Sequence, residues 1–345
     1  MEVALTFAKF AIIAEFVLII LTIAMTYILL LIFNDKRKKR EKLTEEISNY
    51  FAQLIPLEAA SSDFNFPKRW ERLDIIVPVL YKFTKLVQDE SWEKQKLNVV
   101  RAILLPLARR AAESNNWILR FYAAESFGLV YEEVDEKYVI DLVQDPNPLI
   151  RLNAFYTAIY RGSSAAIDII IEKMSVASGL TQAMVLPAFD DASNKTREHV
   201  ELRLQEEMNP VVKATCYVIL LRFPRSQITW EIEKDITSAN IKLRMAAIRF
   251  ITHSDKEIAG PLLLNLLHDA EWQARTVALH CINNIRYLPA IPHVELCLND
   301  PNEWVRLFAS ETLANLQQPG QQIIRTRDVN EEKEVFDIAL QVLDT

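Results

Sequence analysis

Asp300-Pro-Asn-Glu-Trp-Val-Arg306 is one of three related segments, each placing a basic residue six positions after an aspartate. The other two are Asp145-Pro-Asn-Pro-Leu-Ile-Arg151 and Asp269-Ala-Glu-Trp-Gln-Ala-Arg275. Degenerate versions end at Arg120, Lys213 and Arg244. Successive basic residues are 31 positions apart, except for one gap of 62 in which Gln182 holds the skipped position. A fixed period sustained over this length predicts a repeat architecture.

Two further positions in each repeat are small or apolar. Three residues after each basic residue, or after Gln182, come Ala123, Ala154, Val185, Cys216, Ala247, Ala278 and Ala309. Seven residues after come Phe127, Ala158, Phe189, Leu220, Ile251, Ile282 and Leu313. Apolar residues spaced by three, four and seven mark the buried face of a helix. We therefore expect two-helix units whose second helix starts just before the basic residue, stacked because one unit cannot bury both faces.

Polar residues recur in the turn between the two helices. Proline cannot continue the first helix, and we expect the aspartate to cap the second helix by accepting its free N–H groups. The arginine can pair with the aspartate of its own turn or of the next. This predicts a structural ladder of ion pairs built from Arg120, Arg151, Arg244, Arg275, Arg306, Asp145, Asp269 and Asp300.

This turn, followed by an alanine-rich helix, resembles HEAT repeats over about residues 88–317. The 31-residue period is similar to the short HEAT-like repeats of bacterial proteins related to phycobilin lyases. The resemblance implies an all-α solenoid that serves as a binding scaffold. Some membrane-anchored bacterial HEAT-like proteins accompany envelope glycosyltransferases or signalling proteins, which implies a complex such as a polysaccharide synthase or a signalling assembly.

Residues 11–33 form an apolar run interrupted only by Glu15. At about 1.5 Å per residue, a helix of this length crosses a ~30 Å hydrocarbon core. Apolar residues occupy all sides of the expected helix, which favours a transmembrane anchor over a buried soluble helix. A cleaved signal peptide fits poorly because the basic cluster follows the run. Glu15 lies near one end of the span, where it can reach the interface, protonate, or meet a partner helix.

A basic cluster of Lys36, Arg37, Lys38, Lys39, Arg40 and Lys42 directly follows the apolar run. Basic residues remain on the cytoplasmic side of a membrane. We therefore predict a single-pass inner (plasma) membrane protein with its N-terminus outside and its C-terminal domain in the cytoplasm. The cluster is also expected to contact anionic lipid headgroups.

The remainder of the chain is acidic and poor in glycine. Removing the net −2 of residues 1–35 and the net +5 of residues 36–42 from the total of −7 leaves −10 on residues 43–345. A nucleic-acid ligand is disfavoured because neutralising phosphates needs a basic face. With only 5 glycines and no GxGxxG pattern, dinucleotide-binding folds are disfavoured as well.

Motifs for catalysis or cofactors are scarce. The 5 histidines form no HExxH pattern, and the 3 cysteines form no CxxC pair, so we predict no metal and no cofactor. The metal-dependent hydroxylases among HEAT-like proteins use His-Glu pairs, and the chain has no such dipeptide. A non-enzymatic scaffold is the leading interpretation. A HEAT-like lyase-type enzyme and a sensor of a nucleotide second messenger are the alternatives.

Positions five and nine after each basic residue should point away from the buried face. They vary between repeats and include tyrosine, arginine, histidine and asparagine, which are common in protein interfaces. We predict a partner-binding concave face formed by Tyr156, Tyr160, Arg222, Arg249, His253, His280 and Asn284. The arginines and histidines among them would form a basic stripe for an acidic segment of a partner; simple solvation is the alternative.

The expected organisation has five parts. They are an extracytoplasmic N-terminus at 1–10, a transmembrane helix at 11–33, a basic segment and linker at 34–69, the repeats at 70–319 and a capping helix at 320–345. An amphipathic helix is predicted from Asp328 to Leu343, either covering the last repeat or docking on a partner. Trp70 and Trp92 are expected to pack at the first repeat. The oligomeric state is left open.

Overall fold

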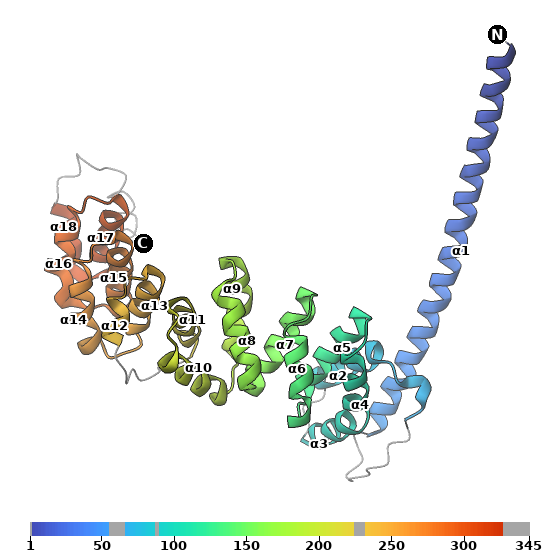
Figure 1. Cartoon of the computed structure of the whole chain (residues 1–345), viewed down its shortest axis with the longest axis horizontal. Coiled ribbons are helices and arrows are strands. Elements are labelled where there is room, and N and C mark those ends of the chain that lie inside the picture. Colours follow the sequence, from blue (N-terminus) through green and yellow to red (C-terminus); the bar gives the residue numbers. More distant parts are fainter. Residues whose placement is uncertain (1, 55–65, 87–89, 224–231, 327–345) are drawn as a thin grey trace. The chain divides into compact units, whose positions relative to one another are not determined.

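The structure is a computed structural model that describes residues 2–54, 66–86, 90–223 and 232–326 (Figure 1). Throughout those ranges the regular secondary structure is helical. The chain divides into two compact units, residues 1–154 and 155–345. The predicted fold class, an all-α solenoid of two-helix repeats, is confirmed.

The first unit contains α1 (Glu2–Leu54), α2 (Leu73–Leu86), α3 (Glu90–Val99), a π-helical turn (Val100–Leu104), α4 (Leu105–Ala112), α5 (Trp117–Leu129) and α6 (Glu136–Leu142). Helix α7 (Pro148–Arg161) runs across the boundary between the units. Within the first unit α1 packs on α2, α2 on α5, and α5 on α4. Each helix therefore buries one face against a neighbour close in sequence.

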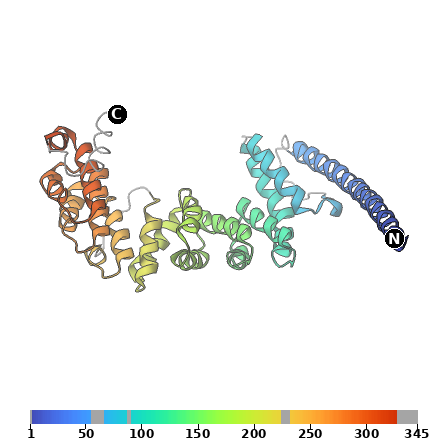
Figure 2. The same ribbon diagram turned by 90° about the horizontal axis from the view of Figure 1, so that it is seen from above.

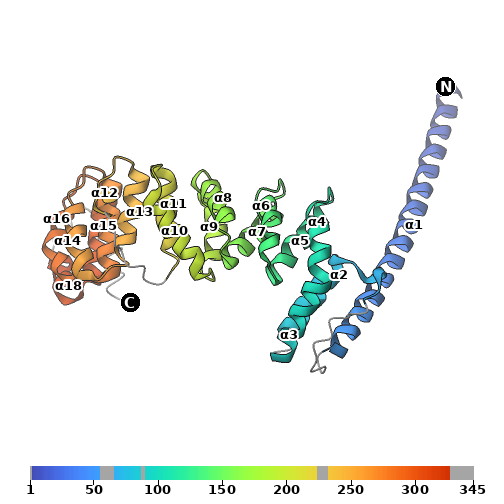
Figure 3. The same ribbon diagram turned by 60° about the horizontal axis from the view of Figure 1, so that its bottom comes forward.

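The second unit continues with α8 (Ser164–Ser175), α9 (Gly179–Val185), α10 (Asn194–Glu206), α11 (Pro210–Leu220), α12 (Ile232–Ile236), α13 (Ile241–Ile251), α14 (Lys256–Leu266), α15 (Trp272–Ile285), α16 (Ile291–Cys297), α17 (Glu303–Asn315) and α18 (Gln317–Thr326). The second helices of the repeats, α11, α13, α15 and α17, pack in series (Figures 2 and 3). The first helices α10, α12, α14 and α16 each pack on their own partner.

The repeat core follows the predicted register without exception. Every residue three or seven positions after the basic residue is buried, from Ala123 and Phe127 to Ala309 and Leu313. Alanine at most of the first positions lets neighbouring helices approach closely, while larger side chains at the second fill the space between them. This regular burial is the main stabilising feature of the stack, because each apolar residue removed from water contributes to folding.

Most second helices are capped by asparagine, whereas α9 is capped by Ser178 and α15 has no side-chain cap. None of them is capped by the aspartate of its turn, so the predicted aspartate cap is wrong. Asn302 accepts the N–H of Trp304 at 3.0 Å and is the residue before α17. Asp300 lies two residues further back and accepts the N–H of Asn302 at 2.9 Å. The aspartate is too far from the first helical turn to cap it and instead closes the turn that precedes the helix. The same asparagine cap occurs at Asn116, Asn209 and Asn240.

Helix α1 is continuous from the apolar run into the first repeat (Figure 1). Ile47 and Phe51 near its end are fully buried, and the Phe51 ring lies 6.3 Å from that of Phe83 on α2. Trp92 packs on Phe83 as well, and Trp70 donates its indole N–H to Glu46 at 3.1 Å. Residues 34–54, expected to belong to the basic segment and linker, are therefore helical, and their last turns pack against the repeats. Residues 55–65 of the expected linker and 327–345 of the expected capping helix lie outside the described residues.

Candidate interaction surface

The ladder of ion pairs joins one repeat to the next. Arg275 donates from Nε and Nη2 to the two carboxylate oxygens of Asp300, at 2.8 Å each. Its Nη1 donates to the carbonyl of Asp269 in its own turn at 2.7 Å. Arg120 and Asp145 repeat this arrangement with a 2.6 Å contact. Each arginine thus ties its own turn to the turn 25 residues later, from Arg275 to Asp300 and from Arg120 to Asp145.

Other rungs depart from this pattern. Arg244 approaches Asp269 at 3.4 Å, whereas Lys213 and the Tyr217 hydroxyl both bind Asp235, at 2.8 and 2.6 Å. Arg151 and Arg306 donate to the carbonyls of their own turns, at 2.7 and 2.8 Å. Position 176, which is 25 residues after Arg151, is a valine, so this position supplies no acid. Arg244, Lys213 and Tyr217 therefore join neighbouring repeats, whereas these contacts of Arg151 and Arg306 stay within their own turns.

Electrostatics at the ladder favour the ionised pairs. Burial raises the pKa of the Asp300 carboxyl, but hydrogen bonds from Arg275 and the Asn302 N–H, with the nearby arginine charges, outweigh burial and hold it below its usual value. A hydrogen bond to Asp145 similarly raises the pKa of Arg120. Such charge-assisted, two-point contacts are stronger than neutral hydrogen bonds.

The predicted partner-binding residues lie on the second unit and none of them is buried. Tyr156 and Tyr160 on α7 are 41% and 55% exposed. Arg249, His280 and Asn284 are exposed as well. Positions five and nine after the basic residue therefore lie at the surface, and these side chains are accessible to a partner.

Two members of the expected basic stripe do not contribute a free charge. Arg222 makes a two-point ion pair with Asp190, one contact being 2.7 Å. His253 is half-buried with its ring 5.4 Å from that of Phe250, and burial lowers its pKa. A histidine with a lowered pKa is neutral at pH 7. The stripe is thus reduced to Arg249 and His280, because neighbouring side chains that the spacing does not reveal neutralise the rest.

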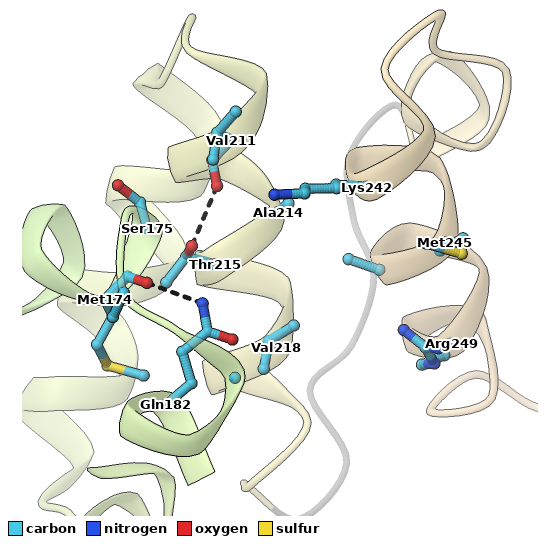
Figure 4. Close-up of a pocket in the computed structure, with 13 residues that line it drawn as sticks. Met174, Ser175, Gln182, Val211, Ala214, Thr215, Val218, Lys242, Met245 and Arg249 are labelled. Atoms are coloured by element: carbon cyan, nitrogen blue, oxygen red, sulfur yellow. Dashed lines mark hydrogen bonds between the residues drawn. The ribbon is translucent and has the colours of Figure 1, made fainter. Parts of the chain in front are cut away.

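A pocket of about 260 Å³ lies beside Arg249, between α8, α9, α11 and α13 (Figure 4). Its lining includes Met174, Val218 and Met245, and the cations Lys242 and Arg249. Figure 4 shows Lys242 extending from α13 toward α11. Sequence reasoning missed Lys242, although the seven-residue spacing of two basic residues on one predicted helix was a usable signal.

The cysteines offer little nucleophilic chemistry. Cys216, Cys281 and Cys297 are all buried. Burial raises their pKa values to about 12, about 12 and about 11, so the thiolate is scarce at neutral pH. Within the described ranges, no group of three or more His, Cys, Asp or Glu residues is placed to hold a metal ion.

The N-terminal part of α1 is long and apolar enough to cross a membrane by length and composition. Its described apolar side chains, Phe16 to Phe33, are exposed, and Glu15 is exposed too. In the basic cluster, Arg37 pairs with Glu41 at 3.5 Å and Lys39 with Asp35 at 2.7 Å. The Arg40 guanidinium donates to the carbonyl of Asp74 on α2 at 3.1 Å.

Comparison with known proteins places the match at the end of the array. Residues 290–318 match the HEAT repeat family, which covers α16 and α17, and the resemblance drawn from the turn is confirmed. Among curated proteins, no match was found.

Solved structures with a similar course of the chain share little sequence with it. Human deoxyhypusine hydroxylase is 15% identical, with 88% of this chain and 98% of that one covered and a TM-score of 0.32. The complex of CpcE and CpcF of phycocyanin lyase from Nostoc sp. is 18% identical, with 69% and 93% covered and a TM-score of 0.31. Kap121p bound to RanGTP is 13% identical, with 86% and 41% covered and a TM-score of 0.36.

Proposed function

We propose that this chain of HEAT-like repeats is a membrane-anchored scaffold that binds partner proteins and positions them at the cytoplasmic face of the inner membrane. The observation that carries the proposal is the continuity of α1. One helix bears the exposed apolar run and, further along, the buried Ile47 and Phe51 of the first repeat. An anchor and a binding array joined by an unbroken helix suit a protein that holds a partner near a membrane.

The physical case for the anchor rests on the cost of exposing the apolar run to water. The 23 residues of 11–33 would span about 35 Å as a helix, and the apolar side chains from Phe16 to Phe33 are exposed, with no described residue covering them. Burying apolar surface yields roughly 25 cal/mol per Å², so a bilayer stabilises this segment strongly. Among the described residues, no contact with another part of the chain buries this segment instead.

Orientation follows from the basic cluster after the run. Lys36, Arg37, Lys38, Lys39 and Arg40 lie on the exposed part of α1 just beyond Phe33. The two ion pairs within this stretch are solvent-exposed and contribute little, which leaves the lysines available to anionic headgroups. The positive-inside rule then puts the repeats in the cytoplasm.

Partner binding is assigned to the exposed positions on the second helices. Tyr156, Tyr160, Arg249, His280 and Asn284 present aromatic and polar groups on the second unit, and such residues are typical of interfaces. The buried thiols, whose pKa values are raised, disfavour catalysis by a cysteine nucleophile. Of the alternatives, a lyase-type activity has no residue set in its favour within the described ranges, and a second-messenger sensor would find two cations at the pocket beside Arg249.

The anchor is tested by fractionating cells that produce the full chain. We expect it in the membrane fraction and resistant to alkaline carbonate, whereas a variant with Ile19→Glu and Ile23→Glu is expected to be extracted. Equal extraction of both would contradict the anchor.

Partner binding is tested by mild detergent extraction and mass spectrometry of co-purified proteins. We expect a specific set of membrane-complex proteins with the wild-type chain and at least about tenfold less with Tyr156→Ala and Tyr160→Ala, since interface tyrosines are often hot spots. The matched control is Leu202→Ala on α10, which is 50% exposed but lies on a first helix. Recovery of the chain alone, or equal capture by all variants, would contradict the scaffold.

A further inference from the structure

Two uncompensated cations define the pocket between α8, α9, α11 and α13. Lys242 and Arg249 stand seven residues apart on α13, about 10 Å along one face. Both are exposed, both line the pocket, and neither has an ion-pair partner among the residues that the structure describes. Nearby, Arg222 is paired with Asp190. In a chain of net charge −7, such a pair favours an anionic occupant.

About half of the pocket lining is apolar, and hydrogen bonds within the chain already engage several of its polar groups. Met174, Val218 and Met245 provide apolar surface, and the two methionines can adapt to the shape of a ligand. The Thr215 hydroxyl donates to the carbonyl of Val211 at 3.0 Å, and the Gln182 amide donates to that of Met174 at 2.8 Å (Figure 4). The pocket thus offers an apolar floor between two cations.

The pocket is small enough to be filled by the side chains of a polypeptide. Its volume of about 260 Å³ lies below the ~300–1,000 Å³ typical of pockets that enclose small ligands. One or two apolar side chains fill such a space, while flanking carboxylates reach the cations at its edge. A helical segment with two acids seven residues apart and an apolar residue between them would match this layout.

The chain contains such a segment near its C-terminal end. Asp337 and Asp344 are seven residues apart, with Leu340 between them, in a stretch predicted as an amphipathic helix. Residues 327–345 carry six acidic and two basic residues, a net charge of −4. We propose that residues 337–344 of this chain dock in the pocket, with the two aspartates at Lys242 and Arg249 and Leu340 on the apolar floor.

The connecting segment is long enough to reach. Helix α18 ends at Thr326 and packs on α17, which packs on α15, which packs on α13. Three steps of up to ~10 Å separate α18 from α13 by about 30 Å. Residues 327–336 span about 33 Å when extended.

Docking requires the start of the predicted helix to be unwound. Asp328, Glu331 and Glu332 place like charges three and four positions apart, and their repulsion offsets part of the stability that acids gain in the first turn of a helix. The docked segment competes with partners for Arg249. A partner must therefore displace it, against the high effective concentration that a short tether produces.

Disulfide trapping in the full chain, purified in detergent, tests the contact. Met245→Cys is combined with Leu340→Cys, and mass spectrometry measures the intramolecular disulfide after mild oxidation. The native thiols are buried with raised pKa values and should react slowly. The matched control is Ile258→Cys with Leu340→Cys, because Ile258 is exposed on α14, in a repeat nearer the end of the chain. We expect at least about tenfold faster trapping at Met245→Cys, since tethered docking raises the effective concentration of the two thiols.

Charge reversal tests whether trapping depends on the proposed ion pairs and not only on the closeness of the two segments. Lys242→Glu with Arg249→Glu should slow trapping to the control rate, and adding Asp337→Lys with Asp344→Lys should restore it. All four substitutions leave the buried core untouched, and circular dichroism checks that the helices remain.

Four outcomes would overturn the proposal. They are trapping at the control rate, trapping that ignores charge reversal, disulfides formed only between two chains, and preferential trapping to Gln318→Cys on α18, which would place the segment over the last repeat. None of them bears on the membrane anchor or partner capture, so failure here is distinct from failure of the scaffold.

Discussion

The repeat that begins at Asp269 and the repeat that contains Gln182 meet their neighbours in different ways. In the first, Arg275 binds both carboxylate oxygens of Asp300 and the carbonyl of its own turn. In the second, the neutral Gln182 donates to the carbonyl of Met174 at 2.8 Å. The helix that carries Arg275 runs for 14 residues, whereas the one that carries Gln182 runs for 7 before a 3₁₀ turn containing Pro187.

The difference shows where the array departs from the regular repeat. The irregular repeat replaces the ladder with a surface network in which Asp168 binds His199 at 2.9 Å and Glu172 binds Arg203 at 2.7 Å. The pocket that Lys242 lines lies beside this repeat. The departure from the regular pattern thus coincides with the candidate binding site.

The largest expected effect comes from breaking a complete rung of the ladder. Asp300→Ala should lower the free energy of unfolding of the second unit by about 3 kcal/mol, because removing one partner leaves a largely buried arginine charge uncompensated. Urea unfolding followed by circular dichroism measures the change. Asp190→Ala, which frees the exposed Arg222, should cost less than about 1 kcal/mol. Equal losses would show that the rung is no stronger than a surface ion pair.

The same rung should respond to acid. The pKa of Asp300 is lowered in the folded chain, so its stabilisation is complete above the unfolded value of about 3.9 and is lost as the pH falls through the folded value. We expect the wild-type chain to exceed Asp300→Asn in stability at pH 7 and the gap to narrow progressively as the pH falls below about 4. Urea midpoints measured from pH 7 to pH 3 check this, and a gap that does not narrow below pH 4 would argue against it.

The two repeats also differ, by a smaller expected effect on stability, in how closely their second helices pack on neighbouring helices. Ala278 is fully buried three residues after Arg275, while the equivalent position after Gln182 already holds Val185. Ala278→Leu overfills a tight contact and should cost about 2 kcal/mol, whereas Val185→Leu should cost under about 1.5 kcal/mol. Thermal unfolding of both variants gives the comparison. The reverse order would mean that the irregular repeat is the more tightly packed one.

The repeat core was predictable because period and residue size determine it together. Where alanine at one position of a helix is followed four residues later by a larger apolar residue, as in Ala278 and Ile282, the pattern identifies the face of the helix that packs against its neighbour. The site was less predictable. Exposure of Arg222 follows from its register, but its neutralisation by Asp190 depends on the path of an irregular turn, which no periodicity describes. The pocket beside Lys242 likewise arises from the packing of several helices at an imperfect repeat.

The smallest and most direct test converts the irregular repeat toward the regular one. Glu207 lies 25 residues after Gln182, the separation that joins Arg275 to Asp300, and it already accepts an ion pair from Arg203 at 2.8 Å. Gln182→Arg should therefore find an acid and raise the free energy of unfolding by about 0.5 kcal/mol, the low end for a hydrogen bond, since the contact to Met174 is lost. Urea unfolding measures the gain, and Gln182→Arg with Glu207→Gln should abolish it. A gain that survives without Glu207, or a loss of stability in the single variant, would mean that the missing arginine is not what sets this repeat apart.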